Sequence, residues 1–178
     1  MKKLLLASLC MASVALTACD KKPNEAATTT GTDNQPVATQ AAVALSKDVA
    51  ADIKSDLIQI QTLSTNKAKE ALAFQNEVTQ AAQKNDKAAL QGIVEKMKSY
   101  TEGFNKELDA LTLKSSEVDA VRSKMKEANN LGVELSEAGL KNPPDINEIN
   151  TLQKKATEMQ QALLTEMQNL QTKANTVK

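Results

Sequence analysis

Apolar residues recur at steps of three and four along the chain after residue 47, which is the spacing of one buried helix face. The pattern predicts four helices, over residues 47–84, 87–113, 117–140 and 146–174, and no strand. The residues predicted to face inward are Val49, Ile53, Leu57, Ile60, Ala71, Phe74, Val78 and Ala81, then Leu90, Ile93, Met97, Tyr100, Phe104, Leu108 and Leu111, then Val118, Val121, Met125, Ala128, Gly132, Leu135 and Gly139, then Ile149, Leu152, Ala156, Met159, Leu163, Met167 and Leu170. Ser64 and Lys67 interrupt the first stripe.

Polar residues at the breaks supply helix-start signals. Asp86 is placed to cap the second helix, and Asp145 with Glu148 is placed to cap the fourth. Ser116 with Asp119 resembles a capping box at the start of the third helix, with Asp in place of the usual Glu.

The connections are about two to five residues long, and Asn142-Pro143-Pro144 stops the third helix. Short loops force neighbouring helices to run antiparallel. The predicted fold is therefore all-α: an antiparallel up-down four-helix bundle with a long first helix, preceded by a flexible tether. The alternative is an extended or oligomeric coiled coil, in which the chain forms a homo-oligomer.

The segment before the first helix has a different composition. Residues 20–46 contain Pro23, Gly31, Pro36 and a run of three Thr, with no large apolar residue before Val37. Such a segment buries too little surface to fold, so it is predicted to be a tether with a reach of roughly 30 Å. Residues 38–45 are Ala-rich, so a backward extension of the first helix remains open.

The first twenty residues form a targeting segment. Lys2 and Lys3 precede an apolar run from Leu4 to Leu16 that is too short to cross a bilayer as a helix. Leu16-Thr17-Ala18-Cys19 resembles the lipobox of bacterial lipoproteins. That resemblance implies a diacylglycerol thioether on Cys19, cleavage after Ala18, and recognition of residues 16–18 by the signal peptidase.

The resemblance divides the chain into a signal peptide (1–18), a lipidated N-terminus with its tether (19–46) and a helical bundle (47–178). Cys10 lies in the signal peptide, so the mature chain has one cysteine and no disulfide. A mature lipoprotein of this kind carries at least two acyl chains, typically palmitate, which anchor it stably. The expected location is the cell envelope, facing the periplasm. Asp20 resembles the signal that retains lipoproteins in the inner membrane.

Composition narrows the function further. The mature side chains carry about −2 net charge, and of the basic residues only Arg122 is Arg, so no nucleic-acid partner is expected. The chain has no Trp and no His, and the lack of His removes the commonest general base and metal ligand. No Gly-rich phosphate loop is present. The sequence predicts neither an enzyme nor a cofactor.

A few residues deserve a chemical interpretation beside a structural one. Met97, Met125, Met159 and Met167 are ligand types for Cu(I), but all four lie on core stripes, which favours core filling. Gly132 and Gly139 either open a groove for a ligand or partner helix, or allow close packing against a bulky neighbour such as Phe104, which is favoured.

Glu134, Glu137 and Lys178 are three further candidates for a functional role. Glu134 and Glu137 are expected on the solvated surface. Lys178 ends the chain, as Lys does in Braun-type murein lipoproteins, but without their basic and aromatic tail.

Two functions follow from these observations. The first is a membrane-anchored periplasmic lipoprotein, non-enzymatic, that acts by binding an envelope protein or another envelope component through its polar surface. The alternative is a small-ligand or metal carrier that uses the bundle interior, for which a polar pocket larger than about 300 Å³ would be required.

Overall fold

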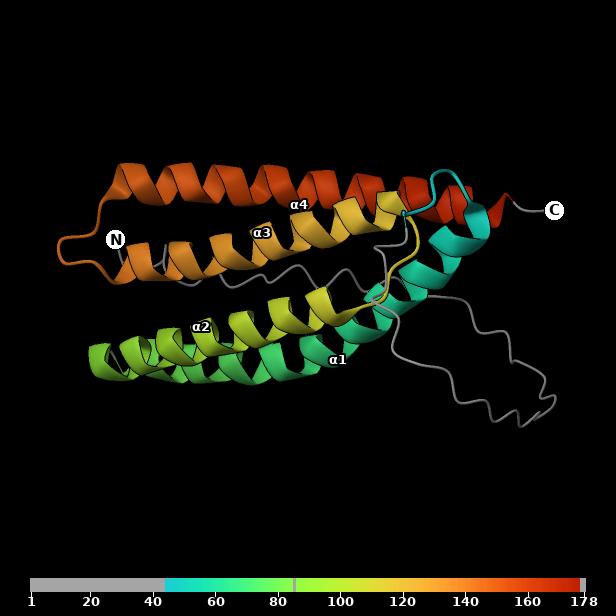
Figure 1. The fold of residues 1–178 in the computed structure, drawn as a ribbon. Helices are drawn as coiled ribbons and strands as arrows, with labels where there is room; N and C mark the ends of the chain where they lie inside the picture. Colours follow the sequence, from blue (N-terminus) through green and yellow to red (C-terminus); the bar gives the residue numbers. More distant parts are fainter. Residues whose placement is uncertain (1–43, 85, 177–178) are drawn as a thin grey trace, which may run out of the picture.

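The structure is a computed structural model that describes residues 44–84 and 86–176. Four helices follow one another along the chain: α1 (Ala50–Gln83), α2 (Lys87–Ala110), α3 (Ser116–Leu140) and α4 (Ile146–Asn175). They run alternately up and down, and each packs against the next, with α4 returning to α1 (Figure 1). The predicted antiparallel four-helix bundle with a long first helix is confirmed.

The helix boundaries differ from the sequence prediction in three places. α1 begins at Ala50 rather than residue 47, since Asp48 has a positive φ of 57° that no α-helix accommodates. α2 ends at Ala110 rather than Leu113, because Leu111 turns to an extended conformation. The predicted capping box of Ser116 and Asp119 is wrong: Ser115 is the N-cap residue, and its side chain does not cap.

The N-caps predicted at Asp86 and Asp145 are confirmed, but the Glu148 carboxylate accepts from the Lys141 ammonium at 2.7 Å and does not complete a capping box. The Asp86 carboxylate accepts a hydrogen bond from the amide of Ala89 at 2.9 Å. The Asp145 carboxylate accepts from the amides of Asn147 and Glu148 at 2.9 and 3.2 Å. Each satisfies amide donors that the first helical turn leaves unpaired, which fixes where α2 and α4 begin.

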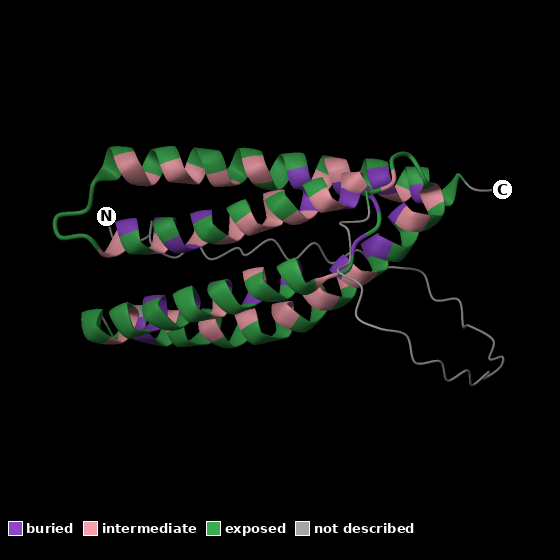
Figure 2. Ribbon diagram, in the orientation of Figure 1, coloured by how far each residue is buried: buried purple, intermediate pink, exposed green. Residues whose placement is uncertain are grey.

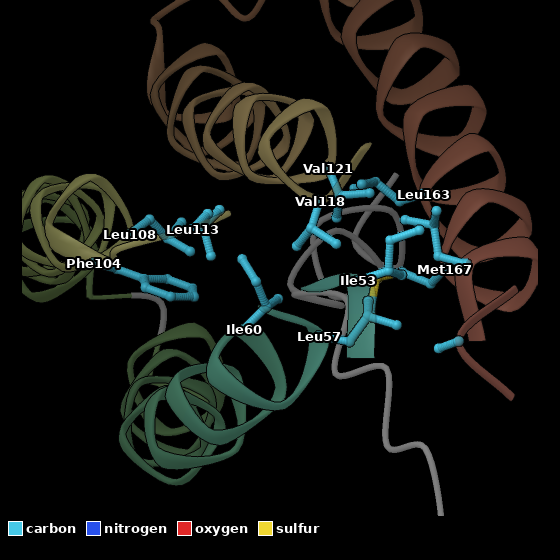
Figure 3. Close-up of a cluster of buried hydrophobic side chains, with 12 residues drawn as sticks. Ile53, Leu57, Ile60, Phe104, Leu108, Leu113, Val118, Val121, Leu163 and Met167 are labelled. Atoms are coloured by element: carbon cyan, nitrogen blue, oxygen red, sulfur yellow. The ribbon is translucent and has the colours of Figure 1, made fainter. Parts of the chain in front are cut away.

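The main hydrophobic core lies at one end of the bundle, where α1 begins, α4 ends and the α2–α3 loop crosses. We call this the clamp end, after the contacts of Asp56 described below. All four helices and the loop contribute side chains that point toward one another (Figure 3). The buried members are Ile53, Leu57, Ile60, Phe104, Leu108, Leu113, Val118, Val121, Leu163, Met167, Leu170 and Ala174.

The opposite end, which we call the far end, carries the α1–α2 and α3–α4 loops. Its second cluster comes from α1 and α2 alone, with Ala81, Ile93 and Met97 buried. α1 curves along its length, so that it lies beside α4 at the clamp end and beside α2 at the far end (Figure 1). α4 has no buried residue before Leu163, and its first turns show only intermediate and exposed positions (Figure 2).

The predicted inward stripes are therefore fully buried mainly at the clamp end. Val49 is 42% exposed, because it lies outside α1. The stripe positions that are only half-buried are Ala71, Phe74, Val78, Leu90, Tyr100, Leu111, Met125, Ala128, Gly132, Gly139, Ile149, Leu152, Ala156 and Met159. α3 buries more than one stripe, including Leu131, Val133 and Ala138, because it packs between α2 and α4.

Candidate functional site

A buried carboxylate holds the α2–α3 loop at the clamp end. Asp56 of α1 has 0% exposure, and its Oδ2 accepts three hydrogen bonds. The donors are the amide of Lys114 at 2.8 Å, the amide of Ser115 at 2.7 Å and the Ser115 hydroxyl at 2.9 Å. Hydrogen bonds to an ionised acceptor are the strong ones, and a buried carboxylate needs them to offset its lost hydration. Asp56 therefore fixes the loop to α1, and we call its three hydrogen bonds to Lys114 and Ser115 the clamp.

The segment before α1 adds a short strap to the same loop. The Ser46 amide donates to the carbonyl of Lys114 at 2.7 Å, and the Ser116 amide donates to the carbonyl of Ser46 at 2.9 Å. The two segments form a parallel bridge between Ser46 and Ser115. The hydroxyls of Ser46 and Ser116 bond to the same two carbonyls, at 3.1 and 3.0 Å. The last residue of the predicted tether is thus hydrogen-bonded to the bundle.

Asp48 extends the strap to α3 and α4. Its amide donates to the Glu117 carboxylate at 2.7 Å, and its own carboxylate accepts from the Lys173 ammonium at 2.7 Å. The hydrogen bond and charge of Lys173 hold the pKa of Asp48 below its usual value, and the same bond raises the pKa of Lys173. Both groups are fully exposed, so their main effect is to position the strap.

The three aromatic residues of the chain gather where the two clusters meet. The rings of Phe74 and Tyr100 contact edge to face with centroids 5.3 Å apart, and those of Tyr100 and Phe104 lie 6.3 Å apart. The Tyr100 hydroxyl donates to the Lys67 carbonyl at 2.7 Å. Burial, together with the charges of Glu70 and Glu107, raises the pKa of Tyr100 to about 12. The phenol therefore stays neutral at physiological pH and joins α2 to α1.

Two shallow depressions are found on the outer surface. One, of about 780 Å³, lies over α3 and α4 and is lined by Lys124, Thr157, Glu158, Gln161, Ala162, Thr165, Glu166 and Asn169. The other, of about 620 Å³, lies over α1 and α2 and is lined by Glu70, Phe74, Glu95, Lys96, Ser99 and Tyr100. Both open outward from the bundle, so neither is the interior pocket that a carrier would need.

The methionines take core positions. Met167 belongs to the cluster at the clamp end and Met125 and Met159 pack against it, whereas Met97 belongs to the cluster at the far end. The four sulfurs therefore do not share one place. Among the described residues, no group of three or more His, Cys, Asp or Glu side chains is placed to hold a metal ion.

The favoured prediction for Gly132, close packing against a bulky neighbour, is wrong. A Cβ added at Gly132 would meet no atom within 4 Å, so the helix faces open space there. Glu134 and Glu137 are both exposed, as predicted, and Glu137 lies 3.5 Å from the Lys98 ammonium.

The predicted lipidation and sorting residues, Leu16, Thr17, Ala18, Cys19 and Asp20, lie outside the described residues, as does Lys178. The contacts of Asp56, Ser46 and Ser115 were not predicted from the sequence. Asp56 gave one signal: it occupies the inward face between Ile53 and Leu57, where an unpartnered charge would be costly. Its partners, 58 and 59 residues further along the chain, left none.

The fold and the contacts of Asp56 define the class of this protein: a small four-helix domain in which residues just before α1 are bonded to one end. Comparison with known families assigns the protein to one family within this class. The sequence model of the family described as "uncharacterised lipoprotein PM1805" matches residues 54–175, well over half of the chain, so the chain belongs to this family. The prediction of a bacterial lipoprotein is confirmed.

Two further comparisons found nothing. No curated protein and no solved structure matches the chain. In the part of the chain that the structure describes, none of the helices is both long and apolar enough to cross a membrane.

Proposed function

We propose that this lipoprotein is anchored in the bacterial cell envelope through acyl chains on Cys19, faces the periplasm, and acts without catalysis by binding an envelope protein or another envelope component. The observation that carries the proposal is the match of residues 54–175 to a lipoprotein family. The lipobox-like residues 16–19 of the same sequence agree with it. Asp20 favours the inner membrane over the outer membrane.

The chemistry of the chain supports a non-catalytic role. It has no His, and its buried carboxylate, Asp56, is fully engaged by loop donors and has 0% exposure, so it cannot reach a substrate. The exposed surface carries many amide and hydroxyl side chains, which can form hydrogen bonds to a protein partner.

The anchor is tested by Cys19→Ser, with Cys10→Ser as the matched control because Cys10 leaves with the signal peptide. Metabolic lipid labelling and membrane fractionation should show the wild type and Cys10→Ser acylated and in the membrane, and Cys19→Ser unlabelled. A serine hydroxyl is a far weaker nucleophile than a thiolate, so it takes no lipid. Equal labelling of all three proteins would refute the anchor.

The binding role is tested by crosslinking in cells followed by mass spectrometry. The wild type should yield a reproducible envelope partner, and Cys19→Ser should lose it because the bundle is no longer held at the membrane. A partner captured equally by the wild type and by Cys19→Ser would show that binding does not depend on the membrane anchor. Capture of no component above background would count against the binding role.

A further inference from the structure

The chain enters the bundle at a fixed point of the clamp end. Ser46 is hydrogen-bonded through both its amide and its carbonyl, to Lys114 and Ser116. Asp48 is bonded to α3 and α4. The last residues of the segment that leads back to Cys19 therefore cannot swing freely around the bundle. A membrane anchor that precedes residue 44 is therefore connected to the bundle at the clamp end.

The lengths of the two parts favour one orientation on a membrane. The 27 residues from Asp20 to Ser46 have the composition of a flexible coil, whose typical reach is roughly 30 Å. α1 has 34 residues and is about 50 Å long. With the far end on the membrane, the linking segment would have to span nearly twice its typical reach. With the clamp end near the lipid, the linking segment needs no such extension, so this orientation is favoured.

The surface of the clamp end suits contact with lipid. Leu45 and Val49, which flank the strap, are 40% and 42% exposed and are two of the five large apolar residues exposed in the described chain. Lys47 lies between them in sequence, and its ammonium forms no ion pair among the described residues. Apolar side chains next to Lys are typical of segments that rest in a phospholipid interface.

Charge does not drive this contact. The Lys173 ammonium at this end is paired with Asp48. Asp52 in the first turn of α1 and Glu117 in the first turn of α3 add two more carboxylates, so the end is not a basic patch. Two partly exposed apolar side chains would bind a membrane weakly on their own. A covalent anchor raises their effective concentration at the surface, which makes a weak contact populated.

We propose that the clamp end rests on the phospholipid surface that holds the anchor, with Leu45 and Val49 entering the headgroup region, so that the far end and its two loops face away from the membrane. This proposal rests on the proposed lipidation of Cys19. It deepens that function by stating which surface meets the lipid and which surface remains free for a partner.

The absence of Trp from the chain allows a direct test. Three variants each carry a single Trp. Leu45→Trp and Val49→Trp probe the clamp end, and Ile146→Trp is the matched control because Ile146 is 60% exposed at the far end. Each full-length, lipidated protein is reconstituted into phosphatidylcholine vesicles, and in parallel into vesicles that also contain anionic phosphatidylglycerol, each with and without brominated lipid. Flotation with the vesicles first verifies the anchor, and circular dichroism verifies folding.

Bromine should quench Trp at positions 45 and 49 at least about twofold more than Trp at position 146, because only the first two reach the interface. Adding Leu45→Ser to Val49→Trp should reduce that quenching. Equal quenching at all three positions, or stronger quenching at 146, would overturn the proposal while leaving the anchor intact. Quenching that appears only with anionic lipid would overturn the apolar contact. Failure to float would overturn the anchor and this proposal with it.

Discussion

The two ends of the bundle are built differently. At the clamp end, side chains from four helices and a loop meet in one core, and Asp56 binds the loop that crosses it. At the far end, the buried cluster comes from α1 and α2, and the first turns of α4 bury no residue. α3 buries residues there too, outside that cluster: Leu131, Val133, Leu135 and Ala138. Both ends arise from the same kind of three- and four-residue apolar spacing. The difference lies in how many helices share each set of side chains.

This difference has a functional consequence. The end that receives residues 44–49 is the one with the larger core and the hydrogen-bonded strap, and it is the end that faces the membrane in our proposal. The far end has fewer buried contacts, and regions with few buried contacts open at lower free energy. A surface that adapts to a partner is expected there rather than at the clamp end.

The largest expected effect separates the two cores. Leu108→Ala removes a side chain with 0% exposure from the clamp end and should lower the free energy of unfolding by about 3–5 kcal/mol. Ile93→Ala at the far end should cost about 2 kcal/mol, because fewer neighbours are lost and the site can collapse. Leu72→Ala, at a position 60% exposed, is the control and should change little. Urea denaturation followed by circular dichroism measures all three; equal losses from Leu108→Ala and Ile93→Ala would remove the distinction.

The second effect concerns the clamp itself. Asp56→Ala leaves the buried amide and hydroxyl of Ser115 and the partly buried amide of Lys114 without their acceptor, and should cost about 3 kcal/mol. Ser115→Ala removes only the hydroxyl donor and should cost about 1 kcal/mol. Denaturation curves give both values. If Asp56→Ala were no more costly than Ser115→Ala, the carboxylate would not be what holds the loop.

The third effect is confined to the far end. Asp86→Ala and Asp145→Ala each remove an N-cap and should cost about 1 kcal/mol. Amide exchange should speed up in the first turns of α2 and α4 and stay unchanged around Ser115. Faster exchange at the clamp end in either variant would mean that the two ends do not behave independently.

The smallest effect is measured at the boundary between the clusters. Because the chain has one Tyr, absorbance at alkaline pH reports Tyr100 alone, and its titration midpoint should lie at about 12. The folded protein holds this proton more tightly than the unfolded chain does. The contribution of Tyr100 to stability is therefore present below pH 10 and is lost as the pH rises toward 12. Glu107→Gln should lower the midpoint, and a wild-type midpoint near 10 would mean that the phenol is exposed.

Much of the bundle was predictable from the sequence. Helix number, order and direction follow from apolar spacing and short loops, and the Asp86 and Asp145 caps follow from local signals that act within three residues. The predicted stripes at Ile53, Leu57 and Leu108 are buried because several helices meet there. Apolar spacing specifies a face, but it does not specify how many neighbours cover that face.

The parts that were not predictable depend on contacts between distant residues. Ser115 looked like a residue next to a capping box, whereas its hydroxyl is used by Asp56, 59 residues earlier in the chain. The strap at Ser46 pairs with Lys114 and Ser116, and short polar segments of this kind carry no periodic signal. Gly132 was expected to allow close packing, but whether a glycine faces a neighbour or open space depends on the path of the other helices.

Hydrogen exchange of the full-length protein tests most directly whether the two ends differ. The account predicts the slowest exchange in the turns around Ile53–Ile60, Leu108, Val121 and Leu163–Leu170, with Ser46 and Ser115 also protected by the strap. It predicts faster exchange in α1 after Phe74, in α2 before Met97 and in α4 before Met159. Equal protection along each helix, or slower exchange at the far end, would contradict it.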